Sequence, residues 1–396
     1  MPATQRSRRL LQAALGLAAG LCGLLLAACG GGGAGEAPGA AASSYTSGTI
    51  TGFGSVIVNG VRFDDSSASI SDDSGSASTA SALKLGMRVE IDGGLVQAGS
   101  ARAHSVRFGS AVLGPVQAVD AAAGTLTVLG QAVTITDTTV FDEALSGGLA
   151  AVSVGHVLDV HGLRDSSSGG IVATRIAPVD VAVGYKLRAP ITALDTTAKT
   201  LAIGGASVSY AGLSGVPASL AVGQVVLVWL AEVPVAGVWQ ATRLAAGPRK
   251  PVDSTTVLVR GAIGSFVSAT SFTLDGLSVD ASAASFPDGT AGLAAGVQVE
   301  VRGSMSNGVL VASQVSIESR HRGDDSRRFE LHGAITSLDA TAKTFVLRGV
   351  TVDYSGSVTW VDGSESTLAV GAKVAVRGTV GSTRSRIVAS RIQFNP

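Results

Sequence analysis

The sequence predicts an all-β protein made of five tandem small barrels, and three observations carry this prediction. A phrase of the form L-x-x-G-x-x-V-x-V recurs, with its glycine at positions 86, 155, 223, 296 and 371. Apolar residues alternate with a period of two around these phrases, which is typical of half-buried strands. Dipeptides such as Asn59-Gly60 and Asp275-Gly276 accept the positive φ angles of a two-residue hairpin turn.

The composition narrows the functional classes. The 396 residues include 29 Lys+Arg and 29 Asp+Glu, so the formal net charge is zero. Nucleic-acid binding normally needs a surplus of basic residues, and base stacking needs aromatic ones, which make up only 4% here. The 46% hydrophobic content argues against disorder. We therefore expect a folded protein that does not bind nucleic acid.

Residues 1–28 are predicted to be a signal peptide. Three arginines (Arg6, Arg8 and Arg9) precede an apolar run that begins at Leu10 and ends in Leu-Ala-Ala-Cys. This ending resembles a bacterial lipobox, which implies that Cys29 is the lipid attachment site and becomes the new N-terminus. A transmembrane anchor with a chance cysteine is the alternative, because the run is about long enough to span a bilayer.

Processing at Cys29 would change the composition. The removed segment holds three arginines and no acidic residue, so the mature chain has 29 − 3 = 26 basic and 29 acidic residues. Cys22 leaves with the signal, so no disulfide can form within the mature chain. The residue after the cysteine, Gly30, favours the outer membrane by resemblance to bacterial lipoproteins. Residues 29–47 are rich in Gly, Ala and Ser, which predicts a lipidated cysteine followed by a flexible tether.

The repeated phrases divide the rest of the chain. We expect barrels at residues 48–110, 111–180, 181–250, 255–318 and 329–396, with a charged linker at 319–328. Each unit has about five short strands and one helical turn before its L-x-x-G phrase. That number and order favour a small Greek-key barrel of the OB type. A series of β-sandwiches is the alternative, although sandwiches usually need about 100 residues per unit.

The recurring phrases resemble a known bacterial family. A starting G-x-I, an alternating hairpin, L-x-x-G-x-x-V-x-V-x-G and a closing V-A-x-x-I are similar to the domain of unknown function 5666, in five copies. The resemblance implies OB-like barrels in envelope lipoproteins and brings no activity or catalytic residues. The first copy departs from the pattern at Ala101 to His104, and the third lacks a glycine after its fourth strand.

Polar clusters give weak candidates for sites. His156 and His161 flank Asp159, and their spacing places them on opposite faces of one strand, so we expect exposed polar residues and no metal site. Asp64-Asp65 and Asp72-Asp73 bracket a serine-rich segment that could hold calcium but lacks the EF-hand order, so a solvated, mobile loop is expected. The other histidines are His104, His321 and His332.

Two further segments are predicted to be structural. Arg322-Gly323-Asp324 resembles an adhesion tripeptide, but it stands in the charged linker, where an exposed linker is the simpler interpretation. The apolar run 220–239 contains Glu232 and Pro234 and overlaps the repeat, which predicts two buried strands with a turn and not a membrane span.

No catalytic constellation, cofactor motif or metal site is visible in the sequence. We therefore expect a non-enzymatic outer-membrane lipoprotein, facing the periplasm or the cell surface. It would be held by its N-terminal lipid and would bind or scaffold a protein or saccharide partner. One alternative is a hydrolase or lyase of envelope polymers with a site between two repeats. A passive stalk or spacer is the other.

Overall fold

The computed structural model describes residues 43–165, 169–247, 251–318 and 328–396. The predicted signal peptide, Cys29, most of the tether, His321 and the tripeptide at 322–324 lie outside these residues. The described chain is almost entirely β-structure, with a few 3-10 turns. Within the described ranges, no helix has the length and hydropathy needed to cross a bilayer.

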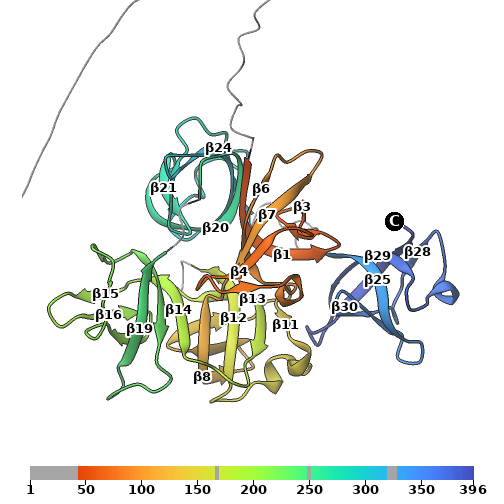
Figure 1. The fold of residues 1–396 in the computed structure, drawn as a ribbon, viewed down its shortest axis with the longest axis horizontal. Helices are drawn as coiled ribbons and strands as arrows, with labels where there is room; N and C mark the ends of the chain where they lie inside the picture. Colours follow the sequence, from red (N-terminus) through yellow and green to blue (C-terminus); the bar gives the residue numbers. More distant parts are fainter. Residues whose placement is uncertain (1–42, 166–168, 248–250, 319–327) are drawn as a thin grey trace, which may run out of the picture. The chain divides into compact units, whose positions relative to one another are not determined.

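Barrel 5, blue in Figure 1, has the plan of every barrel. Its strands form a closed ring in the order β25-β26-β27-β30-β29-β25, in which the β27–β30 contact is parallel and the other four are antiparallel. This ring is the five-stranded Greek key of the OB type, so the predicted fold class is confirmed. The strands are β25 (Phe329–Asp339), β26 (Thr344–Leu347), β27 (Val350–Asp353), β29 (Lys373–Val380) and β30 (Ile387–Phe394).

The other four barrels repeat this order of pairing. Barrel 1 consists of β1 (Ser43–Phe53), β2 (Val56–Val58), β3 (Val61–Asp64), β6 (Arg88–Gly94) and β7 (Ser100–Phe108). Barrel 2 consists of β8 (Val112–Asp120), β9 (Thr125–Val128), β10 (Gln131–Thr134), β12 (Val157–Arg164) and β13 (Ile171–Pro178). Barrel 3 consists of β14 (Tyr185–Pro190), β15 (Ala193–Asp195), β16 (Thr200–Ile203), β17 (Ala206–Ser209), β18 (Val225–Leu230) and β19 (Trp239–Ala246). Barrel 4 consists of β20 (Ser254–Ser268), β21 (Ser271–Leu274), β22 (Leu277–Asp280), β23 (Gln298–Ser306) and β24 (Val309–Ile317).

Barrel 3 departs from the plan at its first strand. Pro190 ends β14, and the chain resumes pairing with β16 only from Thr192 onward. A proline lacks the N–H that a central strand needs, which explains the break. The apolar run 220–239 forms β18, a turn closed by mutual hydrogen bonds between Val235 and Val238, and the start of β19. The prediction of strands in place of a membrane span is therefore confirmed.

The repeated L-x-x-G phrase forms the same turn in every barrel. In barrel 1 the N–H of Met87 donates to the carbonyl of Lys84, and Gly86 between them has φ +81°. A positive φ at the third residue marks a type II turn, where glycine is favoured. The glycine N–H then donates back to the first strand, from Gly86 to Ile50 in barrel 1. The predicted helical turn before the phrase appears as 3-10 turns in barrels 1, 2 and 5 and is absent from the described residues of barrels 3 and 4.

The last strand of every barrel carries a β-bulge where it pairs with the strand before it. In barrel 2, Gly162 pairs with Ala173 and His161 pairs with Arg175, so Thr174 is the extra residue. The same break in register leaves out one residue in each of the other barrels. These residues are His104, Thr242, Ser313 and Ser390.

The predicted end of the flexible tether, at residue 47, is wrong. We expected residues up to 47 to be flexible, but residues 43–49 pair with β6, and residues 44–47 also pair in parallel with β20 of barrel 4 (Figure 1). Tyr45 is 2% exposed and belongs to the apolar core of barrel 4. Burial of the Tyr45 ring in barrel 4 stabilises residues 43–47 as part of a strand, although most of this segment is polar.

The barrels are joined by further strand contacts. Gly52 and Phe53 of β1 pair in parallel with Glu330 and Leu331 of β25, so β1 touches barrels 4 and 5 as well as its own. Strands β8 and β14 pair between barrels 2 and 3. The apolar cores follow these links, because barrels 1 and 5 share one cluster of buried side chains and barrels 2 and 3 share another. The repeats therefore pack against one another and are not independent domains joined only by linkers.

Candidate functional site

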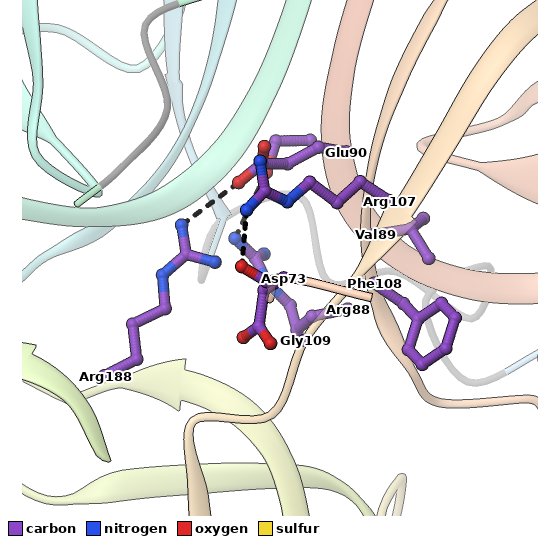
Figure 2. A pocket seen from close by; sticks show the side chains of 9 residues that line it. Asp73, Arg88, Val89, Glu90, Arg107, Phe108, Gly109 and Arg188 are labelled. Carbon is purple, nitrogen blue, oxygen red and sulfur yellow. Dashed lines mark hydrogen bonds and ion pairs between the residues drawn. The ribbon is translucent and has the colours of Figure 1, made fainter. Parts of the chain in front are cut away.

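A small hollow lies where barrels 1 and 3 meet (Figure 2). Its volume is only about 20 Å³. This is roughly the space that one water molecule occupies. In Figure 2, Arg188 reaches across from barrel 3 toward Glu90, while Arg107 bonds to Asp73 from the barrel 1 side. The lining residues are Ser47, Asp73, Arg88, Val89, Glu90, Arg107, Phe108, Gly109 and Arg188.

Ion pairs close this hollow. Arg188 Nη2 lies 3.1 Å from Glu90 Oε1, and Lys186 Nζ lies 2.8 Å from Asp73 Oδ1. Burial acts to lower the pKa of Arg188, but the carboxylates of Asp275 and Glu90 outweigh it and raise the pKa. The guanidinium is therefore charged at every physiological pH. With ion pairs linking the two barrels across it and room for about one water molecule, the hollow is a structural junction.

The prediction of a mobile loop for the acidic segment is wrong at Asp73. We expected Asp64-Asp65 and Asp72-Asp73 to bracket a mobile, solvated loop. Residues 69–72 instead form a strand parallel to β7, and Asp73 is buried against Lys186 of barrel 3. The lysine that fixes this loop comes from a different repeat, so a local reading of the segment could not reveal it.

His161 also departs from its prediction. We expected both histidines on opposite faces of one strand, but His156 lies before β12 begins and is exposed, whereas His161 lies on β12 and is only 2% exposed. Its Nε2 lies 3.7 Å from Asp159 Oδ2, and its Nδ1 accepts from the N–H of Arg88 in barrel 1. Burial acts to raise the pKa of Asp159, but His161 and Lys186 outweigh it and lower the pKa to about 2. The pair belongs to the contact between barrels 1 and 2.

A larger, open groove lies between barrels 1 and 5. Its volume is about 310 Å³, and its lining residues are Gly54, Ser55, Arg62, His332, Gly333 and Arg348. Arg62 extends from β3 of barrel 1, whereas His332 stands on β25 and Arg348 follows β26 of barrel 5. The short contact of β1 with β25 holds the two sides together, so the groove exists only because the two barrels are joined.

Hydrogen bonds fix the two arginines at the groove. Arg348 Nη2 donates to the carbonyl of Gly54 over 3.2 Å, which ties barrel 5 to barrel 1. Arg62 Nη2 lies 2.8 Å from Glu330 Oε1, and Arg62 Nη1 lies 3.2 Å from His332 Nε2. The guanidinium groups are thus held in place, with Arg348 exposed at the rim.

The charge at the groove is positive. Glu330 is the carboxylate there, and it faces Arg62 together with Arg377, whose Nη2 lies 3.5 Å away. The hydrogen bond with His332, followed by the hydrogen bond and charge of Arg62, outweighs burial and lowers the pKa of Glu330 to about 2. Glu330 forms ion pairs with Arg62 and Arg377 and does not neutralise the charge of Arg348. An anionic group is the natural complement of this surface.

The pKa of Glu330 predicts a pH dependence of stability. An unfolded carboxylate titrates near 4.5 and the folded one near 2, so its ion pairs stabilise the native state above pH 4.5. This contribution is lost as the pH falls from about 4.5 to about 2. We expect the difference in unfolding free energy between wild type and Glu330→Gln, measured by urea denaturation, to shrink across that interval. A constant difference over the same interval would contradict this assignment.

The groove was not predicted from the sequence. The sequence patterns assign no role to His332, Arg62 or Arg348. His332 lies 270 positions after Arg62 in the chain, and Arg348 lies 286 positions after it. Only the packing of two barrels brings these residues together. Within the described residues no cluster of three or more His, Cys, Asp or Glu is arranged to hold a metal ion. The one predicted site residue, Cys29, lies outside them.

Comparisons with known proteins give a family but no activity. The family model described as "Domain of unknown function (DUF5666)" matches residues 47–107, 114–177, 260–316 and 332–393. Barrel 3 is not matched, although its strands pair in the same order. No curated protein matches the chain. A solved structure described as "drosophila Unr CSD456" is 14% identical over 55% of this chain and 98% of that chain, but its TM-score of 0.13 supports no argument.

Proposed function

Because the chain belongs to the DUF5666 family, whose domain has no assigned function, we propose a function from the groove itself. The protein is a non-enzymatic, lipid-anchored scaffold of the bacterial envelope that binds an acidic saccharide between barrels 1 and 5. The observation that carries the proposal is the pair of fixed guanidinium groups, Arg62 and Arg348, brought to one groove by two barrels.

The lining of the groove favours a saccharide over a protein partner. Protein interfaces centre on buried aromatic and apolar anchors, and the six lining residues include no Phe, Tyr, Trp or large aliphatic side chain. Arginine guanidinium groups match the planar geometry of a carboxylate and bind it with two parallel hydrogen bonds. Uronic acid units of an envelope polymer carry such carboxylates at regular intervals. An open groove has room for several of these carboxylates to bind along it.

The groove test uses an acidic polysaccharide as the probe. We expect Arg348→Ala to weaken binding of a polyuronate by about tenfold, since a hydrogen bond to a charged group contributes about 1.5–3 kcal/mol. Arg391→Ala is the matched control, because Arg391 is also an exposed arginine of barrel 5 but lies outside the groove lining. Binding is measured by calorimetry at low and at physiological salt. Equal losses in the two variants, or no binding by wild type, would contradict the proposal.

Membrane attachment rests on the lipobox and has its own test. We expect Cys29→Ser to abolish incorporation of a labelled fatty acid and to move the protein from the membrane to the soluble fraction. Two or more acyl chains are needed for stable anchoring, since each buried methylene contributes about 0.8 kcal/mol. Cys22→Ser is the matched control, because Cys22 leaves with the signal and should not affect either readout. Continued membrane association of the Cys29→Ser chain would favour the transmembrane anchor.

Neither alternative function is favoured by an observation. A glycoside hydrolase normally needs two carboxyl groups at the scissile bond, and the acid beside the groove, Glu330, has a pKa near 2 and does not hold a proton for a leaving group. A stalk would gain length with each independent unit, whereas β1 joins three barrels here. Release of unsaturated or reducing ends during the binding assay would identify an enzyme instead.

A further inference from the structure

One of the five L-x-x-G turns is docked against another barrel. Leu85 in the turn of barrel 1 is 2% exposed. The hydroxyl of Thr174, the bulge residue of barrel 2, donates to the carbonyl of Gly86 over 2.6 Å, and Arg175 Nη1 donates to the carbonyl of Leu85 over 3.4 Å. The fit is close, because a Cβ added at Gly86 would lie 2.4 Å from the carbonyl oxygen of Thr174. A turn and a bulge therefore form one complementary pair.

Three further turns have the same shape and are not covered by any other part of the described chain. The glycines at 155, 223 and 371 have φ angles of +90°, +85° and +88°, against +81° for Gly86, and each makes the same hydrogen bond to its first strand. The residues at the position of Leu85 are exposed, with Val154 at 66%, Val222 at 63% and Val370 at 64%. A Cβ added at any of the three glycines would meet nothing within 4 Å. The chain thus carries uncovered copies of the docking turn.

The accepting half is also present in a second, uncovered copy. The sequence Ala-Thr-Arg of barrel 2 (Ala173 to Arg175) recurs in barrel 3 as Ala241 to Arg243. The strand register is equivalent, with Thr242 as the bulge residue. Thr242 and Arg243 are exposed, whereas Arg175 is buried beneath the docked turn.

Arg243 is held ready for such a contact. Its guanidinium stacks on the ring of Trp229 at 4.3 Å, and its Nη1 donates to the carbonyl of Ser74 over 3.3 Å. Arg175 is also held, in its case by an ion pair with the carboxylate of Asp142. A guanidinium that is already oriented loses less entropy when it binds a carbonyl.

We propose that a second copy of this chain occupies the Thr242–Arg243 bulge with one of its Leu-Ala-Val-Gly turns, either at Val222 or at Val370. The contact between barrels 1 and 2 is the template for this pairing. In it, barrel 1 supplies the turn and barrel 2 supplies the bulge. The contact is not reciprocal, because the turn of barrel 2 at Val154 stays uncovered. A contact of that kind joins copies head to tail. On a membrane surface, where lipid anchors concentrate the protein, such assembly would align many saccharide grooves.

The test measures self-association of the full chain with Cys29→Ser, which removes lipid as a cause of association. Sedimentation velocity should show an average mass that rises with concentration. Thr242→Val keeps the shape of the side chain but removes its hydroxyl, so association should weaken about tenfold. Thr242→Ser keeps the hydroxyl and should remain within twofold of the parent.

A second variant tests the turns themselves. Val222→Asp combined with Val370→Asp places charges on exposed positions, so the fold should be unaffected while association is lost. Unchanged circular dichroism and unfolding midpoints confirm that each variant is folded. A parent chain that stays monomeric at every concentration overturns the proposal. So does equal association of the parent, Thr242→Val and the double aspartate variant. Loss of saccharide binding alone would not affect it.

Discussion

Tyr45→Ala is expected to destabilise barrel 4, although Tyr45 belongs to barrel 1 in the order of the chain. The ring is 2% exposed and packs among the buried apolar side chains of barrel 4. Removing a buried aromatic side chain typically costs 3–5 kcal/mol, so we expect a loss of about 4 kcal/mol. The measurement is amide hydrogen exchange, in which the protection of β20 and β23 should fall by the corresponding factor.

Tyr45→Phe is the matched control, because it keeps the ring and removes only the hydroxyl. We expect it to cost much less than the alanine variant, because the ring stays in the core of barrel 4. Protection of β20 and β23 that is the same in the alanine and phenylalanine variants would mean that the ring does not pack in barrel 4.

Gly86→Ala is expected to separate barrels 1 and 2. Alanine at φ +81° costs about 1–2 kcal/mol by itself. The added Cβ would also lie 2.4 Å from the carbonyl oxygen of Thr174, so the docked turn must move away. Overpacking of this kind adds about 1–3 kcal/mol, giving a total of about 3 kcal/mol. Urea unfolding measures the loss, and limited proteolysis should begin near the freed turn.

Gly223→Ala separates the two causes. Gly223 has nearly the same φ, +85°, but nothing lies within 4 Å of an added Cβ. Only the backbone term remains, so we expect a loss of about 1 kcal/mol. Equal losses for the two alanine variants would show that the turn of barrel 1 is not docked on Thr174.

The strand plan of each barrel could be predicted from the sequence because its causes are local. Period-two alternation selects strands, and the turn formed by residues such as Asn59-Gly60 and Asp275-Gly276 requires positive φ angles that these residues accept. The repeated glycine of the L-x-x-G turn is required for the same reason. These constraints act within a few residues and recur at a fixed spacing, so repetition strengthens a weak signal.

The contacts between barrels could not be predicted, because each depends on residues far apart in the chain. Tyr45 looks like part of a polar tether until β20 lies beside it, and Asp73 looks like a solvated loop residue until Lys186 reaches it. His161 is buried where Arg88 of barrel 1 donates its backbone N–H to the imidazole. The candidate groove has the same origin, since Arg62 and Arg348 become neighbours through the β1–β25 contact.

Strand β1 joins barrel 1 to barrels 4 and 5, and amide hydrogen exchange of residues 44–47 in the wild-type protein shows whether the join to barrel 4 forms. These residues pair with β6 on one side and β20 on the other. We expect their amides to be protected as strongly as those of β20 and β23. Exchange at the rate of an unfolded peptide would show that this segment is a tether after all, and the contact between barrels 1 and 4 would then lose its basis.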